Sequence, residues 1–506
     1  LLSRQGMPPQ ASYLFKHALV QDAAYGTLLR EPRRALHARI AEAIEGQFAE
    51  TAESRPEILA NHCTEAGLIE KAATLWGNAG LRSLDRSALV EAIEQLKRAL
   101  DQIATLPGTP SLRREQIKLQ VALITPLIHI KGYAAAETKA AVEQARSLIE
   151  QAEALAEPPE DSMLLFTVLL AFWTANFTAF NGDVIRDLAA QFLALVKKQG
   201  ATFPLLRGHI LMGQSLMCTG EIAKGRAHFD QAIALYDPTV HRPLAARFGQ
   251  ASGVAMLVHR AFAQWLLGYP DAALRDADDS LKKAREIGQA ATLMHTLGHR
   301  AAIFTLFGNY AVAVADTREL LVVAEEKGSP FWKTSGTMNH GSVLALTGRP
   351  LDASEMLISG ISAWRTMGAS VFLPMYLPHL ARAHAELGQF EEAWRCIGEA
   401  MTTTETTKET WFEAEVHRVA GEIALKSPEP DVAKAQACFE RALSIARAQQ
   451  AKSWELRAAM SMARLWHEQG KRQQAGDLLV PIYGWFTEGF DTLDLREARA
   501  LLDELS

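Results

Sequence analysis

Apolar residues recur at helical spacing along nearly the whole chain, and glycine interrupts this pattern at regular distances. Gly268, Gly308, Gly348 and Gly388 follow one another at intervals of 40 residues. Further copies have the equivalent turn position at Gly182, in a weaker match, and at Gly220, Pro430 and Gly470. Because glycine adopts positive φ at little cost, each copy predicts two antiparallel helices joined by a tight turn.

The helix after each turn alternates small and large residues on one face. Five positions after the turn stand Ala273, Ala313, Ala353, Ala393 and Ala475, and large residues follow at Leu357, Ile397, Phe439 and Leu479. Small residues allow a close helix crossing, and large ones fill the neighbouring gap. A single pair cannot bury this face, so the pattern predicts an all-α solenoid of about ten stacked helix pairs.

The pattern resembles the tetratricopeptide repeat (TPR), most closely over residues 73–106. The first helix of that copy matches at Trp76, Ala79 and Gly80, and the second at Ala92, Leu96 and Ala99. Elsewhere the period is about 40 residues, as in the extended repeats found behind signalling ATPases. The resemblance implies a right-handed α-α superhelix whose first helices line a concave wall.

Both ends of the chain carry a second resemblance. Residues 12–45 have helical periodicity and resemble the last helical piece of a STAND-type AAA-like ATPase module; the matching residues are Phe15, His17, Leu19, Val20, Gln21, Asp22, Ala23, Ala24, Tyr25, Arg33, Leu36, His37, Ile40 and Ala41. Residues 451–506 resemble the closing segment of bacterial proteins that join a class III nucleotide cyclase, an ATPase module and TPR-like repeats. We therefore expect residues 1–55 to end an ATPase module and residues 56–506 to form the solenoid.

The residues needed for nucleotide chemistry are missing from this sequence. It contains no G-x-x-x-x-G-K-[ST] phosphate loop and no nucleophile elbow, so we assign no catalytic residue and no cofactor. We expect the chain to be the C-terminal portion of a longer protein, with ATP and Mg²⁺ bound only by upstream domains. The resemblance implies a protein-interaction or sensor region of a bacterial signalling ATPase, coupled to an adenylate or guanylate cyclase domain. A free-standing TPR adaptor and the solenoid of a STAND-type transcription activator remain alternatives.

The net charge and the cysteine spacing restrict the class of partner and the cellular location. The formal net charge is −6, with 52 basic and 58 acidic residues spread evenly, which argues against nucleic acid. The four cysteines are far apart and form no framework, and no export leader is recognised, which favours a cytoplasmic location. Residues 162–182 carry no charge and are long enough to span a bilayer. Their flanks lack a Lys/Arg cluster, however, and their end fits the repeat phase, so we predict a buried solenoid helix and no membrane partner.

The concave wall is the predicted binding surface, for a protein or peptide and for the ATPase and cyclase domains of the same chain. The phase of the first helices places on it His295, Thr305, Met338, Ser342, Met375, Arg382, His417, Arg457, Arg464 and His467. Such a mixture suits an acidic or amphipathic peptide, because arginine binds carboxylates through two hydrogen bonds. His295 and His299 stand four apart on one helix, but no third metal ligand follows at a recognisable spacing, so packing is the favoured interpretation and no metal is assigned.

Overall fold

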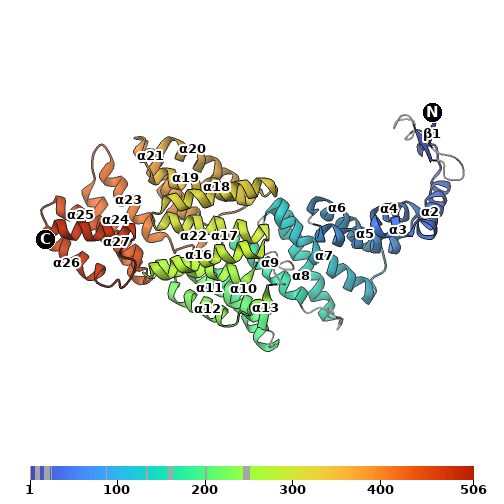
Figure 1. Ribbon diagram of the computed structural model, residues 1–506, viewed down its shortest axis with the longest axis horizontal. Helices are drawn as coiled ribbons and strands as arrows, with labels where there is room; N and C mark the ends of the chain where they lie inside the picture. Colours follow the sequence, from blue (N-terminus) through green and yellow to red (C-terminus); the bar gives the residue numbers. More distant parts are fainter. Residues whose placement is uncertain are drawn as a thin grey trace. The chain divides into compact units, whose positions relative to one another are not determined.

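The computed structural model of the chain describes residues 2–5, 12–15, 23, 25–86, 88–132, 135–155, 157, 163–199, 202–242 and 251–506 (Figure 1). Two short strands, β1 (Leu2–Gln5) and β2 (Ser12–Phe15), form an antiparallel ladder. The helices of the first part are α2 (Arg30–Gln47), α3 (Ala49–Ser54), α4 (Pro56–Ala66), α5 (Ile69–Asp85), α6 (Leu89–Ile103), α7 (Pro110–Lys131) and α8 (Ala136–Ala154).

The remaining helices follow one another with short connections. They are α9 (Met163–Thr178), α10 (Gly182–Gln199), α11 (Thr202–Cys218), α12 (Ile222–Ala234), α13 (Pro238–His241), α15 (Ser252–Leu266), α16 (Pro270–Ile287), α17 (Ala290–Leu306), α18 (Tyr310–Glu326), α19 (Pro330–Leu346), α20 (Pro350–Thr366), α21 (Leu373–Glu386), α22 (Phe390–Thr407), α23 (Glu413–Lys426), α24 (Val432–Ala448), α25 (Lys452–Glu468), α26 (Arg472–Tyr483) and α27 (Leu493–Leu505).

The chain divides into two compact units. One comprises residues 1–127 and 147–161, and the other comprises residues 128–146 and 162–506. The boundary that we predict from the sequence, between residues 55 and 56, lies inside the first unit and stays a prediction about the parent protein's modules.

The predicted helix pairs are confirmed. Within the described residues, α5/α6, α9/α10, α11/α12 and the six consecutive pairs from α15/α16 to α25/α26 give nine packed helix pairs, and α27 follows them. The predicted turn glycines at 220, 268, 308, 348, 388 and 470 all have positive φ, and Ala273, Ala313, Ala353, Ala393 and Ala475 are fully buried. The TPR-like copy is also confirmed, because α5 and α6 bury Trp76 and Leu96 where they cross.

The N-terminal segment differs from its prediction. Residues 12–15 form strand β2 instead of the helix that the periodicity of residues 12–45 suggested, because their backbone pairs with residues 2–5. The resembling positions His17, Leu19, Val20, Gln21, Asp22 and Ala24 lie outside the described residues. From Arg30 onward the predicted helix is present as α2, which buries His37 and Ala41.

The predicted repeats in the second unit wind into a superhelix whose successive turns touch. Ser370 and Val371 donate backbone N–H groups to the Thr178 carbonyl at 2.9 and 3.1 Å, and Ser370 Oγ donates to the Ala179 carbonyl, 191 residues away. Ser453 Oγ donates to the Trp265 carbonyl at a separation of 188 residues. One superhelical turn therefore takes slightly fewer than five 40-residue repeats.

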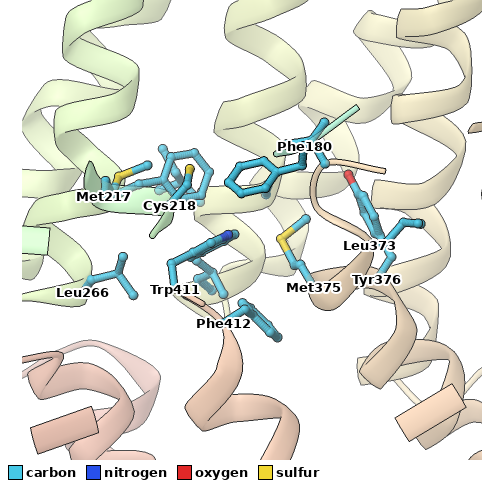
Figure 2. Close-up of a cluster of buried hydrophobic side chains, with 14 of the residues drawn as sticks. Phe180, Met217, Cys218, Leu266, Leu373, Met375, Tyr376, Trp411 and Phe412 are labelled. Carbon is cyan, nitrogen blue, oxygen red and sulfur yellow. The ribbon is translucent and has the colours of Figure 1, made fainter. Parts of the chain in front are cut away.

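We call this contact the seam. On one side it comprises residues 178–182, 218–221, 265–272 and 306–309, and on the other residues 370–372, 408–411, 452–457 and 485–494. Figure 2 shows part of its apolar filling, in which Phe180, Met217, Cys218 and Leu266 meet Leu373, Met375, Tyr376, Trp411 and Phe412. The side chains of the inner helices thus pack against one another across the superhelix.

The turn glycines divide into two groups at the seam. A Cβ atom added at Gly308 would lie 2.4 Å from Leu493, and one added at Gly268 would lie 2.5 Å from Trp485. At Gly348, Gly388 and Gly470 an added Cβ would meet no atom within 4 Å. Gly268 and Gly308 are therefore needed both for positive φ and for the close approach of two superhelical turns. Gly348, Gly388 and Gly470 are needed for positive φ alone.

Helix α9 contains most of the uncharged stretch that raised the membrane question. Among the described residues, no helix combines the length and the apolar character that crossing a bilayer requires. Phe166, Trp173 and Phe177 of α9 are instead buried in the core of the second unit, as the repeat phase predicts.

Candidate functional site

Half of the predicted concave-face residues lie in the protein interior. His295, Thr305, Met338, Ser342 and Met375 are each less than a tenth exposed, and Met338 is fully buried. The prediction of a partner surface at these five positions is therefore wrong for this structure, because the inner helices pack against one another and close the wall. The superhelical radius decides whether the inner wall is open, and no sequence motif encodes that radius.

Arg382, His417 and Arg457 keep partial exposure, and both arginines belong to an ion network on the inner helices. Arg457 lies 2.9 Å from Asp494 Oδ2 and also donates to the Leu306 carbonyl across the seam. Arg382 lies 2.8 Å from Glu422, which also accepts from Arg418.

The arginines and carboxylates of this network are paired with one another. Burial opposes ionisation of Glu415, but Arg418 and Arg457 outweigh it and hold the Glu415 pKa at about 2. Burial lowers the pKa of His417 to about 4, so this imidazole is neutral at pH 7. The hydrogen bonds of Arg457 thus hold the superhelix together, while the side chain of Arg382 stays partly exposed to solvent.

Arg464 and His467 are brought together in an open cleft between α25 and α27. The cleft has a volume of about 310 Å³ and is completed by Glu468, Glu497, Ala500, Leu501 and Glu504. Arg464 is paired with Glu497 at 2.9 Å, and both side chains are 45% exposed. Because three glutamates surround one arginine, this cleft is a poor match for an acidic peptide.

A larger groove lies where two superhelical turns meet, outside the predicted wall. It has a volume of about 610 Å³ and is lined by Ala223, Arg226, Ala227, Asp230, Leu267, Tyr269, Arg447, Gln450, Lys452 and Trp485. Helix α12 and the turn before α16 supply one side, and residues 447–452 and Trp485 supply the other. We call it the inter-turn groove.

Two adjoining aromatic rings in this groove are flanked by cations. Arg226 lies 4.8 Å from the ring centre of Tyr269, and Lys452 lies 5.4 Å from that of Trp485. The Tyr269 and Trp485 rings meet edge to face at 5.7 Å, and Trp485 is 37% exposed. Such an aromatic floor offers apolar contact between positively charged groups.

The charge of the groove is positive. Three lining side chains are cationic and one, Asp230, is acidic; Asp230 accepts from Arg260 at 2.9 Å, whereas Arg226 stands 3.8 Å away. Arg447 and Lys452 both donate to Glu455, and these hydrogen bonds outweigh burial and lower its pKa. Each of the three cations therefore has an acidic neighbour, while the groove lining itself carries three positive charges and one negative charge.

The sequence offered little signal for this groove. Arg226 and Arg447 are more than 200 residues apart, and neither lies on a first helix, where the predicted binding residues stand. The one available clue was Trp485, a large aromatic residue placed after a helix outside the repeat phase.

Comparison with known proteins supports the fold. No family model matches the chain. A curated, uncharacterised protein of Rhizobium meliloti (strain 1021) is 25% identical over 473 residues, which is 92% of this chain and 44% of that protein. The chain thus spans less than half the length of this relative.

Solved structures of helical-repeat proteins are similar at low sequence identity. A Rap protein complexed with Competence and Sporulation Factor is 11% identical with a TM-score of 0.50, and the match covers 78% of this chain and 100% of that one. The apo form of the quorum sensor NprR from B. thuringiensis is 14% identical with a TM-score of 0.44, covering 73% and 98%. A STAND protein with a TPR sensor from Pyrococcus horikoshii is 12% identical with a TM-score of 0.34, covering 82% and 54%. The match to the Rap protein agrees with the helical-repeat fold of this chain.

Proposed function

We propose that this chain is the recognition and regulatory region of a larger cytoplasmic signalling protein and that it binds an acidic, partly apolar peptide segment in the inter-turn groove. The single observation that carries the proposal is the pair of adjoining rings, Tyr269 and Trp485, flanked by Arg226 and Lys452 in an open groove with one acidic lining residue. Carboxylates of the ligand pair with the cations, and its apolar side chains pack on the two rings.

The position of the groove gives binding a route to regulation. Arg226 and Tyr269 belong to one superhelical turn, and Arg447, Lys452 and Trp485 belong to the next. A segment that contacts both sides binds more tightly when the seam is closed than when it is open. This difference in affinity is what a ligand needs to shift a conformational equilibrium and signal to other domains.

Peptide binding tests the recognition step. A labelled peptide of alternating Glu and Leu is titrated into the full chain and followed by fluorescence anisotropy, beside a peptide with Gln at every Glu. We expect the Glu peptide alone to bind, with an affinity that falls as salt rises. The double variant Arg226→Gln/Arg447→Gln weakens binding about tenfold or more, since a hydrogen bond to a charged group contributes about 1.5–3 kcal/mol.

Lys452 stays unchanged in that variant so that buried Glu455 keeps a partner. The matched control is Arg349→Gln/Arg395→Gln, which removes two exposed arginines, one at the N-cap of α20 and one on α22, that pair with Asp352 and Glu392. Equal binding of both peptides, or equal loss in both double variants, would overturn recognition by this groove.

The identity of the larger protein is tested separately, by the coding sequence upstream. We propose an ATPase module coupled to a nucleotide cyclase, on the resemblance of residues 12–45 and 451–506 and on the greater length of the R. meliloti relative. A phosphate loop together with paired cyclase aspartates is the expected result. Absence of both would support a free-standing adaptor, and a DNA-binding helix-turn-helix would support a transcription activator.

A further inference from the structure

Three histidines from two consecutive inner helices meet in the interior of the second unit. His259 lies on α15, and His295 and His299 lie on α17. Their ring centres are 5.4, 5.1 and 4.2 Å apart for the pairs 259–295, 259–299 and 295–299. One ring nitrogen from each lies within 4.8 Å of those of the other two. The third ligand that the sequence spacing did not reveal is therefore present.

The hydrogen bonds of two rings fix which nitrogen is available. His259 Nδ1 lies 2.7 Å from the Ala255 carbonyl, and His299 Nδ1 lies 2.8 Å from the His295 carbonyl. A carbonyl can only accept, so both Nδ1 atoms carry the proton and both Nε2 atoms present a lone pair. Metal-binding histidines are oriented in this way, by donating the other ring N–H to a backbone carbonyl.

The third ring has an unused polar atom. Among the residues that the structure describes, His295 Nδ1 is buried without a hydrogen-bond partner. A neutral imidazole with a free ring nitrogen is the form that binds a metal, and this unpartnered nitrogen leaves His295 able to turn toward one.

We propose that His259, His295 and His299 bind one divalent transition-metal ion of the zinc class, which links α15 to α17. Imidazole suits zinc and its neighbours, and three protein ligands leave one position for another ligand. Tetrahedral Zn–N bonds of about 2.0–2.1 Å place ligand nitrogens about 3.4 Å apart, so the rings need to move inward by less than about 1 Å each.

The surroundings favour this assignment in two respects and oppose it in two. Trp332 lies 5.7 and 5.9 Å from His295 and His299, which supplies an apolar wall, and His299 retains partial exposure as a route of entry. Gln214 Nε2 donates to His259 Nε2 at 2.7 Å and occupies the lone pair that a metal needs, so this amide must turn away for the ion to bind. The charge of Arg207, which lowers the pKa of His259 and His295, disfavours a second cation. We therefore expect an anion such as hydroxide or chloride as the remaining ligand.

Cobalt titration tests the site in the full chain. After treatment with a chelator, wild type should bind one Co²⁺ per chain, with the visible absorption of tetrahedral cobalt, and Zn²⁺ should displace it. His295→Ala and His299→Ala should each weaken binding on the order of 100-fold or more, since loss of an outer partner alone costs about 10–100-fold. This site does not depend on the proposed peptide binding.

Matched controls separate the site from other histidines. His379→Gln removes a buried histidine of α21 outside the cluster, and His209→Gln/His228→Gln removes a pair whose Nδ1 atoms lie 2.9 Å apart. Both controls should bind Co²⁺ as wild type does. X-ray absorption of the zinc-loaded wild-type chain should show three imidazoles, and this measurement requires no variant to fold. Fewer than three imidazoles, no tetrahedral cobalt spectrum, or loss of binding only in the control variants would each overturn the proposal.

Discussion

Replacing Glu409 by glutamine tests how the seam is held. This carboxyl group is fully buried, and it accepts hydrogen bonds from the backbone N–H of Phe372 at 2.9 and 3.0 Å and from Trp411 Nε1 at 3.0 Å. All three bonds come from neutral groups. Burial therefore prevails and raises the Glu409 pKa from 4.5 to about 8, although the two donors lower it in part.

The direction of the pH effect follows from proton binding. Between pH 4.5 and about 8 the folded protein keeps the Glu409 proton while the unfolded chain has lost it. The folded state binds more protons, so stability falls as pH rises through this window. Each pH unit costs about 1.4 kcal/mol, and the shift of about 3.5 pH units gives about 5 kcal/mol in total. Glutamine keeps the shape and cannot ionise, so Glu409→Gln removes this cost.

Hydrogen exchange followed by mass spectrometry measures the effect locally, in peptides covering Phe372 and Trp411, after correction for the intrinsic pH dependence of exchange. The stability of Glu409→Gln relative to wild type should rise by about 1.4 kcal/mol per pH unit from pH 5 and level off near pH 8. Buried histidines contribute equally to both proteins and cancel. The control Glu405→Gln changes an exposed carboxylate on α22 and should give a flat difference. A flat difference for Glu409→Gln as well would refute the reasoning.

Two further predictions concern packing and charge. Gly421→Ala places a Cβ 2.4 Å from Phe439, so we expect the free energy of unfolding in urea to fall by about 1–3 kcal/mol. In the control Gly398→Ala, the added Cβ has no atom within 4 Å, and the free energy of unfolding should rise by about 0.5–1 kcal/mol. Equal effects of the two substitutions would contradict the packing of α23 on α24. Arg457→Gln leaves Asp494 and Glu415 without this cation and should lower the free energy of unfolding by about 3–5 kcal/mol in the same assay. Arg464→Gln breaks an exposed ion pair and should lower it by about 1 kcal/mol or less. Similar losses for the two arginines would show that Arg457 does not hold the seam.

The helix pair of a single repeat could be predicted from the sequence. The packing of successive superhelical turns, which closes the inner wall, could not. Positive φ at Gly388 and full burial of Ala393 follow from contacts within one repeat, which the 40-residue period makes visible. The burial of Met338 depends instead on how many repeats complete a superhelical turn. That number is set by small rotations at every interface between helix pairs, and no single motif encodes it.

The proposed metal ligands could be predicted from the sequence only in part. His259 and His299 are 40 residues apart, which is one repeat, so they occupy equivalent positions on adjacent inner helices. Stacking brings equivalent positions of consecutive repeats side by side. A search for ligands at one-repeat spacing would have joined His259 to the pair at 295 and 299, whereas a search within one helix could not.

The seam is also recorded in residues that depart from the repeat. The turns that follow α16, α18 and α20 each have glycine at positive φ, at Gly288, Gly328 and Gly368. The next two equivalent turns have Lys408 and Gln450, which adopt positive φ without being glycine. Such a conformation costs on the order of 1 kcal/mol for an ordinary residue and persists where its surroundings hold it in place. Lys408 packs at Gly182, and Gln450 lines the inter-turn groove. Each of the three turns that meet the preceding superhelical turn thus holds a non-glycine residue at positive φ, namely Phe372, Lys408 and Gln450, although the first of these turns also keeps Gly368. These residues mark the closed superhelix and its groove as properties of this sequence and not a by-product of stacking alone.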